Sequence, residues 1–218
     1  MSAEATVERS KGSGTSNAAK RALEFLRFQI ISGELSPGEQ IRQQETAEQL
    51  GISRVPLREA LGVLADLGMV DHKPNQGFFV IKRSSHEVTQ ISRMLQLLET
   101  ELMTTLERPD ATTVLALQQL HEEMTALVDD VDWTPFLLKN REFHFRIFEL
   151  SSERLIFSEV QRLWLLADPY IALKLASADS RRQTLKEHAA ILTALRRGDM
   201  KAATGALDDH RKSSGTRR

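Results

Sequence analysis

Residues 69–81 break the helical spacing of apolar residues that runs through most of this 218-residue chain. In this stretch, "MVDHKPNQGFFVI", β-branched and aromatic residues stand on both sides of "PNQG", a run of turn-forming residues. The pattern predicts one β-hairpin. Because no further strand pattern follows before the C-terminus, we expect a mainly α fold with this small hairpin inserted.

Three helices are expected before the hairpin. Apolar residues recur at helical spacing over residues 18–31, and the glycines and proline of "SGELSPGEQI" end that pattern. A short helix follows at about residues 43–50 and closes at Gly51, and the next begins three residues later, in "GISRVPLREALGVL". Helix, tight turn, helix and hairpin, in this order, are the parts of a winged helix-turn-helix.

The third of these helices is only half apolar. Leu57, Leu61 and Leu64 share one face, whereas Arg54 and Arg58 lie four residues apart on another face. In helix-turn-helix proteins the start of this helix meets base edges and phosphates, and an arginine there can bind guanine through two hydrogen bonds. An exposed face whose arginines pair with ordinary carboxylates is the alternative, and the arginines alone do not decide between the two.

The start of the same helix has suitable capping residues. Ser53 suits the N-cap position, and Pro56 is tolerated in the first turn because the N–H groups there have no intrahelical partner. The helix should therefore begin at Ser53 and present its unpaired N–H groups outward, an arrangement that favours phosphate. At the hairpin tip, Gly77 either serves the turn or lets the backbone approach DNA.

The overall composition restricts the function classes only weakly. With 29 Lys and Arg against 30 Asp and Glu, any nucleic-acid binding must come from a local patch. The chain has no cysteine, which excludes disulfides and thiolate metal sites and fits a cytoplasmic location. No apolar run approaches the roughly 18 residues of a membrane span, so no membrane partner is expected. Residues 1–17 are small and polar, and we expect a disordered arm there.

After residue 83 the pattern is helical throughout, which predicts an all-α bundle. Pro109, Pro135 and "RGD" at 197–199 are the breaks between helices. Six helices are expected, at about residues 86–107, 111–129, 134–151, 154–176, 180–197 and 199–213.

Three of the six histidines in the chain lie on apolar faces of these predicted helices. They are His144, His188 and His210, and Asn140 lies one turn before the first of them on the same face. A buried imidazole needs partners for its ring nitrogens, and one solution is that all three meet at a metal in the bundle core. Three separately hydrogen-bonded core histidines are the alternative. The other three, His72, His86 and His121, are interpreted as surface or wing residues.

The stretch from about residue 20 to 81 resembles the GntR family of bacterial transcription regulators. The resemblance is carried by "IISGELSPGEQI", "AEQLGISRVPLREAL", "LADLGMV" and "GFFV", in that order. It implies that Ser53, Arg54 and Arg58 meet DNA and that Gly77 is the wing glycine. One departure is Val55, where many members have threonine.

Residues 86–213 resemble the FCD ligand-binding domain found on one large GntR subgroup. Many such domains hold a divalent metal, here expected to be zinc, nickel or manganese, on one Asp and three His. The resemblance implies His144, His188 and His210 as ligands, with Asn140 where Asp is usual, and a carboxylate effector. A second departure is Leu95, one turn before Glu99, where members often have an arginine.

The predicted domains are residues 1–17, 18–83 and 84–218, which we assign to the arm, the winged helix-turn-helix and the effector-binding and dimerisation domain. The predicted function is that of a homodimeric regulator, expected to be a repressor. It would bind double-stranded operator DNA with an affinity controlled by a small-molecule effector, and it would not be an enzyme. A metal-dependent hydrolytic enzyme and a helical protein-interaction module are the alternatives.

Overall fold

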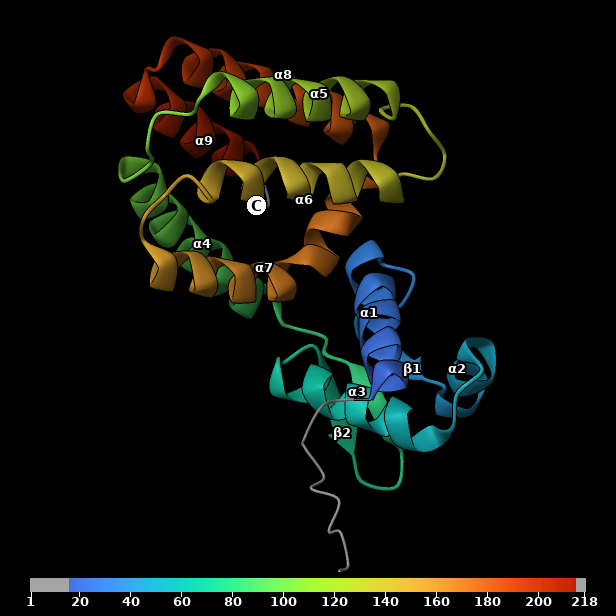
Figure 1. The fold of residues 1–218 in the computed structure, drawn as a ribbon. Helices are drawn as coiled ribbons and strands as arrows, with labels where there is room; N and C mark the ends of the chain where they lie inside the picture. Colours follow the sequence, from blue (N-terminus) through green and yellow to red (C-terminus); the bar gives the residue numbers. More distant parts are fainter. Residues whose placement is uncertain (1–15, 215–218) are drawn as a thin grey trace, which may run out of the picture.

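The structure is a computed structural model that describes residues 16–214; the predicted arm therefore lies almost entirely outside the described residues. Within the described range, nine helices and three short strands form an N-terminal head and a helical domain (Figure 1). The boundary of the arm was placed too late in the chain. Asn17 already belongs to the first helix, because the Ser16 hydroxyl caps it by accepting a hydrogen bond from the Ala19 N–H at 3.2 Å.

The head contains the three predicted helices. These are α1 (Asn17–Ser32), α2 (Gln43–Leu50) and α3 (Arg54–Asp66), and α3 packs against both of the others. Gly33 and Gly51 end α1 and α2 with φ of 81° and 62°, a backbone region that glycine adopts without steric cost. The fully buried side chains between the helices include Leu26, Ile30, Leu57, Leu61 and Leu64.

The predicted hairpin is confirmed, but it belongs to a three-stranded sheet. Strand β2 (Val70–Lys73) pairs antiparallel with β3 (Gly77–Val80), so that Lys73 lies opposite Gly77. The other edge of β3 pairs with β1 (Gln40–Ile41), which the sequence reading missed. Two residues are too few to show strand periodicity.

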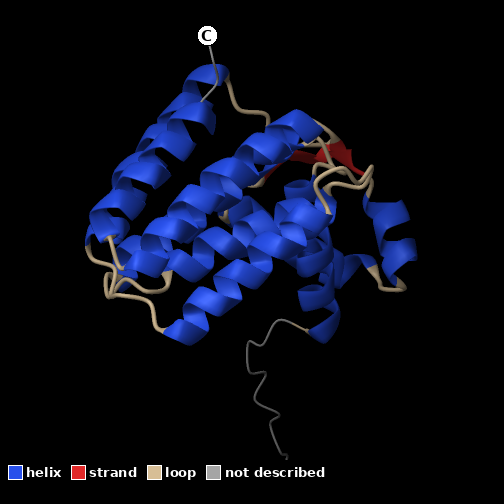
Figure 2. Ribbon diagram, turned by 90° about the horizontal axis from the view of Figure 1, so that it is seen from above, coloured by secondary structure: helices blue, strands red, loops and turns tan. Residues whose placement is uncertain are grey.

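The helical domain contains the six predicted helices, and several of them end about one turn earlier than expected. Their bounds are α4 (Ser85–Thr104), α5 (Ala111–Ala126), α6 (Thr134–Phe148), α7 (Arg154–Leu175), α8 (Ala178–Arg197) and α9 (Met200–Ser214). Helix α4 packs on α7 and α9, α5 packs on α6 and α8, and α8 packs on α9. Figure 2 shows these helices lying alongside one another, with the strands confined to the head. No helix in the described residues is long and apolar enough to span a bilayer.

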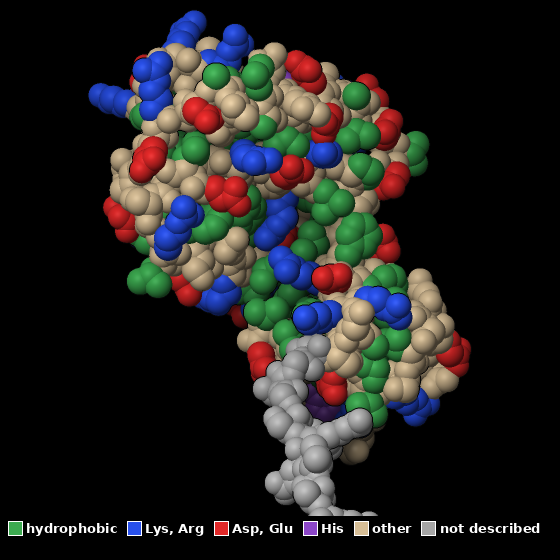
Figure 3. All heavy atoms as spheres, viewed as in Figure 1, with side chains coloured by type: hydrophobic (Ala, Val, Ile, Leu, Met, Phe, Trp, Pro, Cys, Tyr) green, Lys and Arg blue, Asp and Glu red, His purple; other side chains and the backbone are tan. Residues whose placement is uncertain are grey.

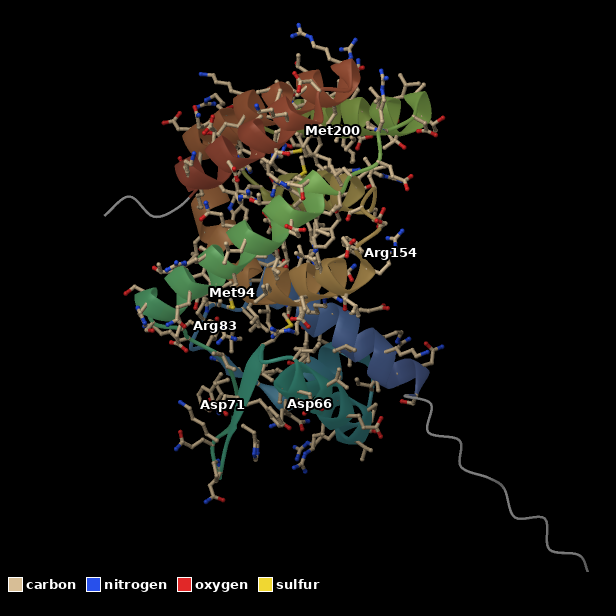
Figure 4. All side chains as sticks on the ribbon, turned by 90° about the vertical axis from the view of Figure 1, so that its left-hand side faces the viewer. Asp66, Asp71, Arg83, Met94, Arg154 and Met200 are labelled. Carbon is tan, nitrogen blue, oxygen red and sulfur yellow. The ribbon has the colours of Figure 1, made fainter. Side chains whose placement is uncertain are left out.

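Helix α7 also contacts the head, through α1 (Figure 1). The Arg83 backbone N–H, in the segment between β3 and α4 (Figure 4), donates a hydrogen bond to the Tyr170 hydroxyl at 2.9 Å. At the same junction the buried Asp168 carboxylate forms an ion pair with Arg141 of α6, and half-buried Arg27 of α1 lies close enough to be attracted by Asp168. Lys and Arg side chains gather along this junction on the face drawn in Figure 3.

A buried arginine fixes the end of α7. Arg181 is 3% exposed, and its guanidinium donates to the carbonyl oxygens of Val128, Leu175, Ala176 and Asp130 at distances of 2.7–3.1 Å. Two of these carbonyls end α7, where backbone acceptors lack intrahelical partners and the helix dipole favours a cation.

Arg181→Met is therefore expected to lower the free energy of unfolding by about 3–5 kcal/mol, because four backbone carbonyls, one buried and three partly buried, lose their charged donor. Arg182→Met is the matched control, since its ion pairs with Asp129 and Asp179 are exposed and should be worth less than about 1 kcal/mol. Urea unfolding of both variants measures the difference. Equal losses in the two variants would contradict the role assigned to Arg181.

Candidate DNA-binding surface and metal centre

The predicted DNA-contacting residues lie together at the exposed start of α3. Ser53, Arg54 and Arg58 are all exposed, while Leu57 on the opposite face is fully buried. Ser53 is the N-cap residue, as predicted, but its hydroxyl makes no capping hydrogen bond. The hydroxyl and the first-turn N–H groups are therefore available to an outside acceptor such as a phosphate.

Arg54 has a neighbour that the sequence reading did not identify. Its Nε donates to the Gln44 side-chain oxygen at 2.9 Å, its Nη2 donates to the same atom, and the Gln44 amide nitrogen donates to Glu48. The direct partner of Arg54 is thus a neutral amide and not the carboxylate that the alternative reading required. Gln44 was missed because it lies ten residues away on α2, and only the tight turn brings the two side chains together.

At the wing, the backbone conformation of the turn explains why residue 77 is a glycine. Its φ of 94° lies in the region that favours glycine, and an added Cβ would lie 3.4 Å from the Gln43 amide nitrogen. The tip is also tied to β1, because the Gln40 side chain donates to the Gln76 carbonyl at 2.6 Å. The turn therefore explains Gly77, and its contact with DNA stays a prediction.

Arg54→Ala and Arg58→Ala should each weaken specific operator binding by about 1–3 kcal/mol, the size of a lost bidentate base contact. The fold should be retained, because both side chains are exposed. Titrations of a selected operator at fixed salt measure the effect, and circular dichroism checks the fold. Unchanged affinity in both variants would rule out their role in reading DNA.

The three predicted metal-ligating histidines meet in the core of the helical domain. His144 of α6, His188 of α8 and His210 of α9 are each at least 94% buried, and one ring nitrogen from each lies within 4.8 Å of the others. The Nε2 atoms of His144 and His188 are 3.2 Å apart. The prediction that the three imidazoles converge is confirmed.

Aromatic side chains enclose this histidine cluster. Phe143 stacks on His188 with ring centroids 4.2 Å apart, and Trp164 lies 5.2 Å from His144. Burial holds the pKa values of His144 and His188 well below the usual histidine range. Both rings are therefore neutral at pH 7, the form in which an imidazole can bind a metal.

The donor set fits a divalent transition metal. Two nitrogens bound to one tetrahedral zinc at about 2.0–2.1 Å would stand about 3.3 Å apart, close to the observed 3.2 Å. The side-chain oxygen of Asn140 is buried without a hydrogen-bond partner in the described residues, and Asn140 lines the same cavity as His144 and His210. Imidazole nitrogens suit zinc, nickel and related ions.

The cavity beside the cluster has a volume of about 760 Å³ and is walled mainly by α4, α6, α7 and α9. Its lining is largely apolar but includes four cationic side chains, of Arg93, Lys174, Arg211 and Lys212. Among the described lining residues Glu99 is the one carboxylate, and it is held by Arg211 at 2.9 Å and by the Trp164 N–H at 2.7 Å. Arg211 thus reaches the cavity from the last helix and contacts Glu99, in a domain that has leucine and not arginine at position 95.

Two residues around the site were missed by the sequence reading, and one was misplaced. Arg211 directly follows an inward-facing histidine, and Glu187 directly precedes another; these adjacencies were the available signal. The Glu187 carboxylate lies 2.6 Å from His210 Nδ1. His121, interpreted as a surface residue, is half-buried, and its Nε2 lies 3.0 Å from the Leu185 carbonyl.

Comparison with known protein families gives one match for the head and one for the helical domain. Residues 18–80 match the family "Bacterial regulatory proteins, gntR family", and residues 90–213 match the FCD domain. The chain belongs to the GntR family, in the group with an FCD domain. This GntR regulator is 27% identical to the HTH-type transcriptional regulator McbR of Escherichia coli over 188 residues, with 84% of each chain covered. It is 23% identical to the HTH-type transcriptional repressor RspR of the same species, over 85% of this chain and 82% of RspR.

The fold is shared with solved structures along almost the whole chain. E. coli McbR/YncC superposes with a TM-score of 0.82 at 23% identity and covers 91% of this chain and 95% of its own. A GntR regulator from Rhodococcus sp. RHA1 gives 0.77 at 23% identity, covering 92% and 96%. The two family matches identify the chain as a DNA-binding transcriptional regulator, and the families and relatives that it matches are not enzymes.

Proposed function

We propose that this GntR regulator is a homodimeric repressor whose operator affinity is set by a small carboxylate effector, bound beside a divalent metal in the helical domain. The proposal is carried by the convergence of His144, His188 and His210 next to a cavity of about 760 Å³. A cavity of this size accommodates a small metabolite. The similar protein RspR is a transcriptional repressor, which supports the sign of the regulation.

The three imidazoles would hold the metal. The Asn140 oxygen, which has no hydrogen-bond partner among residues 16–214, is the candidate for a fourth ligand. When bound, the ion would offer a coordination position to a carboxylate oxygen of the effector. Arg93 lines the same cavity and carries a charge suited to a second anionic group. The apolar remainder of the lining would select the body of the molecule.

Helix α7 supports a coupling between this cavity and the head. Leu166, Ala167 and Ile171 line the cavity. Tyr170 lines it too, and its hydroxyl accepts the hydrogen bond from the Arg83 backbone. An effector that binds one position of α7 more tightly would thus favour one placement of the head. The size of the change in operator affinity would be set by how much more tightly the effector binds the protein with one head placement than with the other.

A dimer is proposed because one recognition helix reads only a few base pairs. Two half-sites related by two-fold symmetry give the specificity that a single operator requires. Because the head presents α3 and the wing to DNA, we place the dimer contact in the helical domain.

Protein purified without chelator or affinity metal provides the test. Native mass spectrometry should show two chains with one metal per chain, and any retained small molecule in the same spectrum. Operator titrations with acetate, succinate and citrate as probes, before and after chelation, should then show an affinity change that requires metal. A monomer even with operator present would exclude the dimer, and identical titrations under all conditions would exclude effector control by carboxylates.

A further inference from the structure

We infer that Glu187 is a positioning residue for the metal centre: it fixes the tautomer of His210 and supplies the negative charge that Asn140 lacks. This inference rests on the proposed metal occupancy. It is motivated by the distance of 2.6 Å between the Glu187 Oε2 and the His210 Nδ1, with both side chains largely buried.

The contact determines which nitrogen of His210 can bind an ion. A carboxylate only accepts hydrogen bonds, so the proton of a neutral His210 ring must sit on Nδ1. The lone pair is then on Nε2, which is the nitrogen that can bind an ion. An acceptor on the non-ligating nitrogen is the usual way in which proteins orient a metal-binding imidazole and raise its basicity.

The position of Glu187 is itself fixed. Its other oxygen, Oε1, accepts a hydrogen bond from the Gln183 side chain at 2.6 Å, one turn earlier on α8. Lys174 lies near enough for its positive charge to interact with Glu187. The carboxylate is therefore held from two sides while it contacts His210, and its oxygens do not belong to the cluster of candidate ligand atoms.

Charge balance gives the second argument. A divalent cation on three neutral imidazoles and a neutral amide has no anion among its direct ligands. Glu99, the carboxylate of the cavity lining, is already paired with Arg211. Glu187 reaches the centre through one imidazole, so its negative charge is well placed to stabilise the ion.

Two variants separate the two effects. Glu187→Gln keeps the shape and removes the charge, whereas Glu187→Met also removes the acceptor for His210. Competition of Zn²⁺ with a chromophoric chelator should show affinity lowered by about 10-fold in Glu187→Gln and towards 100-fold in Glu187→Met, the range for lost outer partners of metal ligands. Glu122→Gln is the matched control. Gln118 donates a hydrogen bond to Glu122 one turn later on α5, just as Gln183 does to Glu187, but Glu122 lies outside the histidine cluster.

Two further experiments test the role of Glu187 in other ways: a spectroscopic measurement of the His210 tautomer and a rescue of zinc affinity by a second substitution. Nitrogen-15 spectra of the metal-free wild type should show His210 protonated on Nδ1, and Glu187→Met should change this to a tautomer mixture. Adding Asn140→Asp to Glu187→Gln should restore zinc affinity, because it returns a negative charge to the centre.

The outcomes distinguish the inference from the function on which it rests. Wild-type zinc binding with Glu187→Met within 2-fold of it, and an unchanged His210 tautomer, would overturn the role of Glu187 and leave the metal centre intact. A wild type that binds no stoichiometric zinc would overturn the metal centre and this role together.

Discussion

Arg141→Met is expected to lower the free energy of unfolding by about 3–5 kcal/mol at pH 8, because it leaves a buried carboxylate without its cation. The side chain of Asp168 is fully buried, and Arg141 is its ion-pair partner. The Arg141 guanidinium also lies 4.5 Å above the Phe145 ring and 5.6 Å from Trp164, so the variant loses these contacts as well.

The loss should depend on pH in a defined direction. Burial raises the pKa of Asp168 to about 6, although Arg141 opposes this rise. Since the pKa in the folded protein exceeds the unfolded value of about 3.9, stability falls as pH rises between these two values, by about 3 kcal/mol in total. Without Arg141 the pKa should rise further, so the deficit of the variant should be large at pH 8 and small at pH 5, where Asp168 is mostly protonated.

Urea unfolding at the two pH values tests this, with Arg146→Met as the control on an exposed position of the same helix. The quantity of interest is the difference between the two variants at each pH. The same difference at pH 5 and pH 8 would contradict the assignment of the effect to the charge of Asp168.

Asn140→Asp should strengthen metal binding by at least about tenfold, equivalent to 1.4 kcal/mol or more. Asn140 lines the cavity together with His144 and His210, and its side-chain oxygen is buried without a hydrogen-bond partner in the part of the chain that the structure describes. A carboxylate there adds an anion next to the cation, where the amide offers only a dipole. In the metal-free protein the same change buries an uncompensated carboxylate, so the variant should depend more on metal for its folding.

Chelator competition measures the affinity, and melting curves with and without chelator measure the dependence of folding on metal. Asn140→Asp should melt below the wild type when metal is removed and above it when metal is restored. A variant that melts lower under both conditions, in a protein that binds no stoichiometric metal, would identify the three histidines as ordinary core residues.

The sequence predicted features that depend on one helix at a time. The inward faces of His144, His188 and His210 follow from the apolar residues around each one, and their convergence follows because a bundle has one core. The exposed face of Arg54 and Arg58 was readable for the same reason. Contacts between distant elements could not be read in this way, because they depend on how the helices are placed together. The pairs Asp168–Arg141 and Glu99–Arg211 join residues that are 27 and 112 positions apart. Residues 40–41 form a strand, β1, only because they pair with β3.

The position of α7 between the cavity and α1 limits how freely the two domains can be exchanged between relatives. A chimera that joins the helical domain of this protein to another head would keep Asp168 and Tyr170. It would lose Arg27, and the backbone at position 83 that donates to Tyr170, unless both were grafted with it. Engineered sensors built from this chain should therefore place the fusion point before Arg83 and carry the α7-facing surface of α1 with the helical domain. The unit of exchange is then larger than the DNA-binding motif itself.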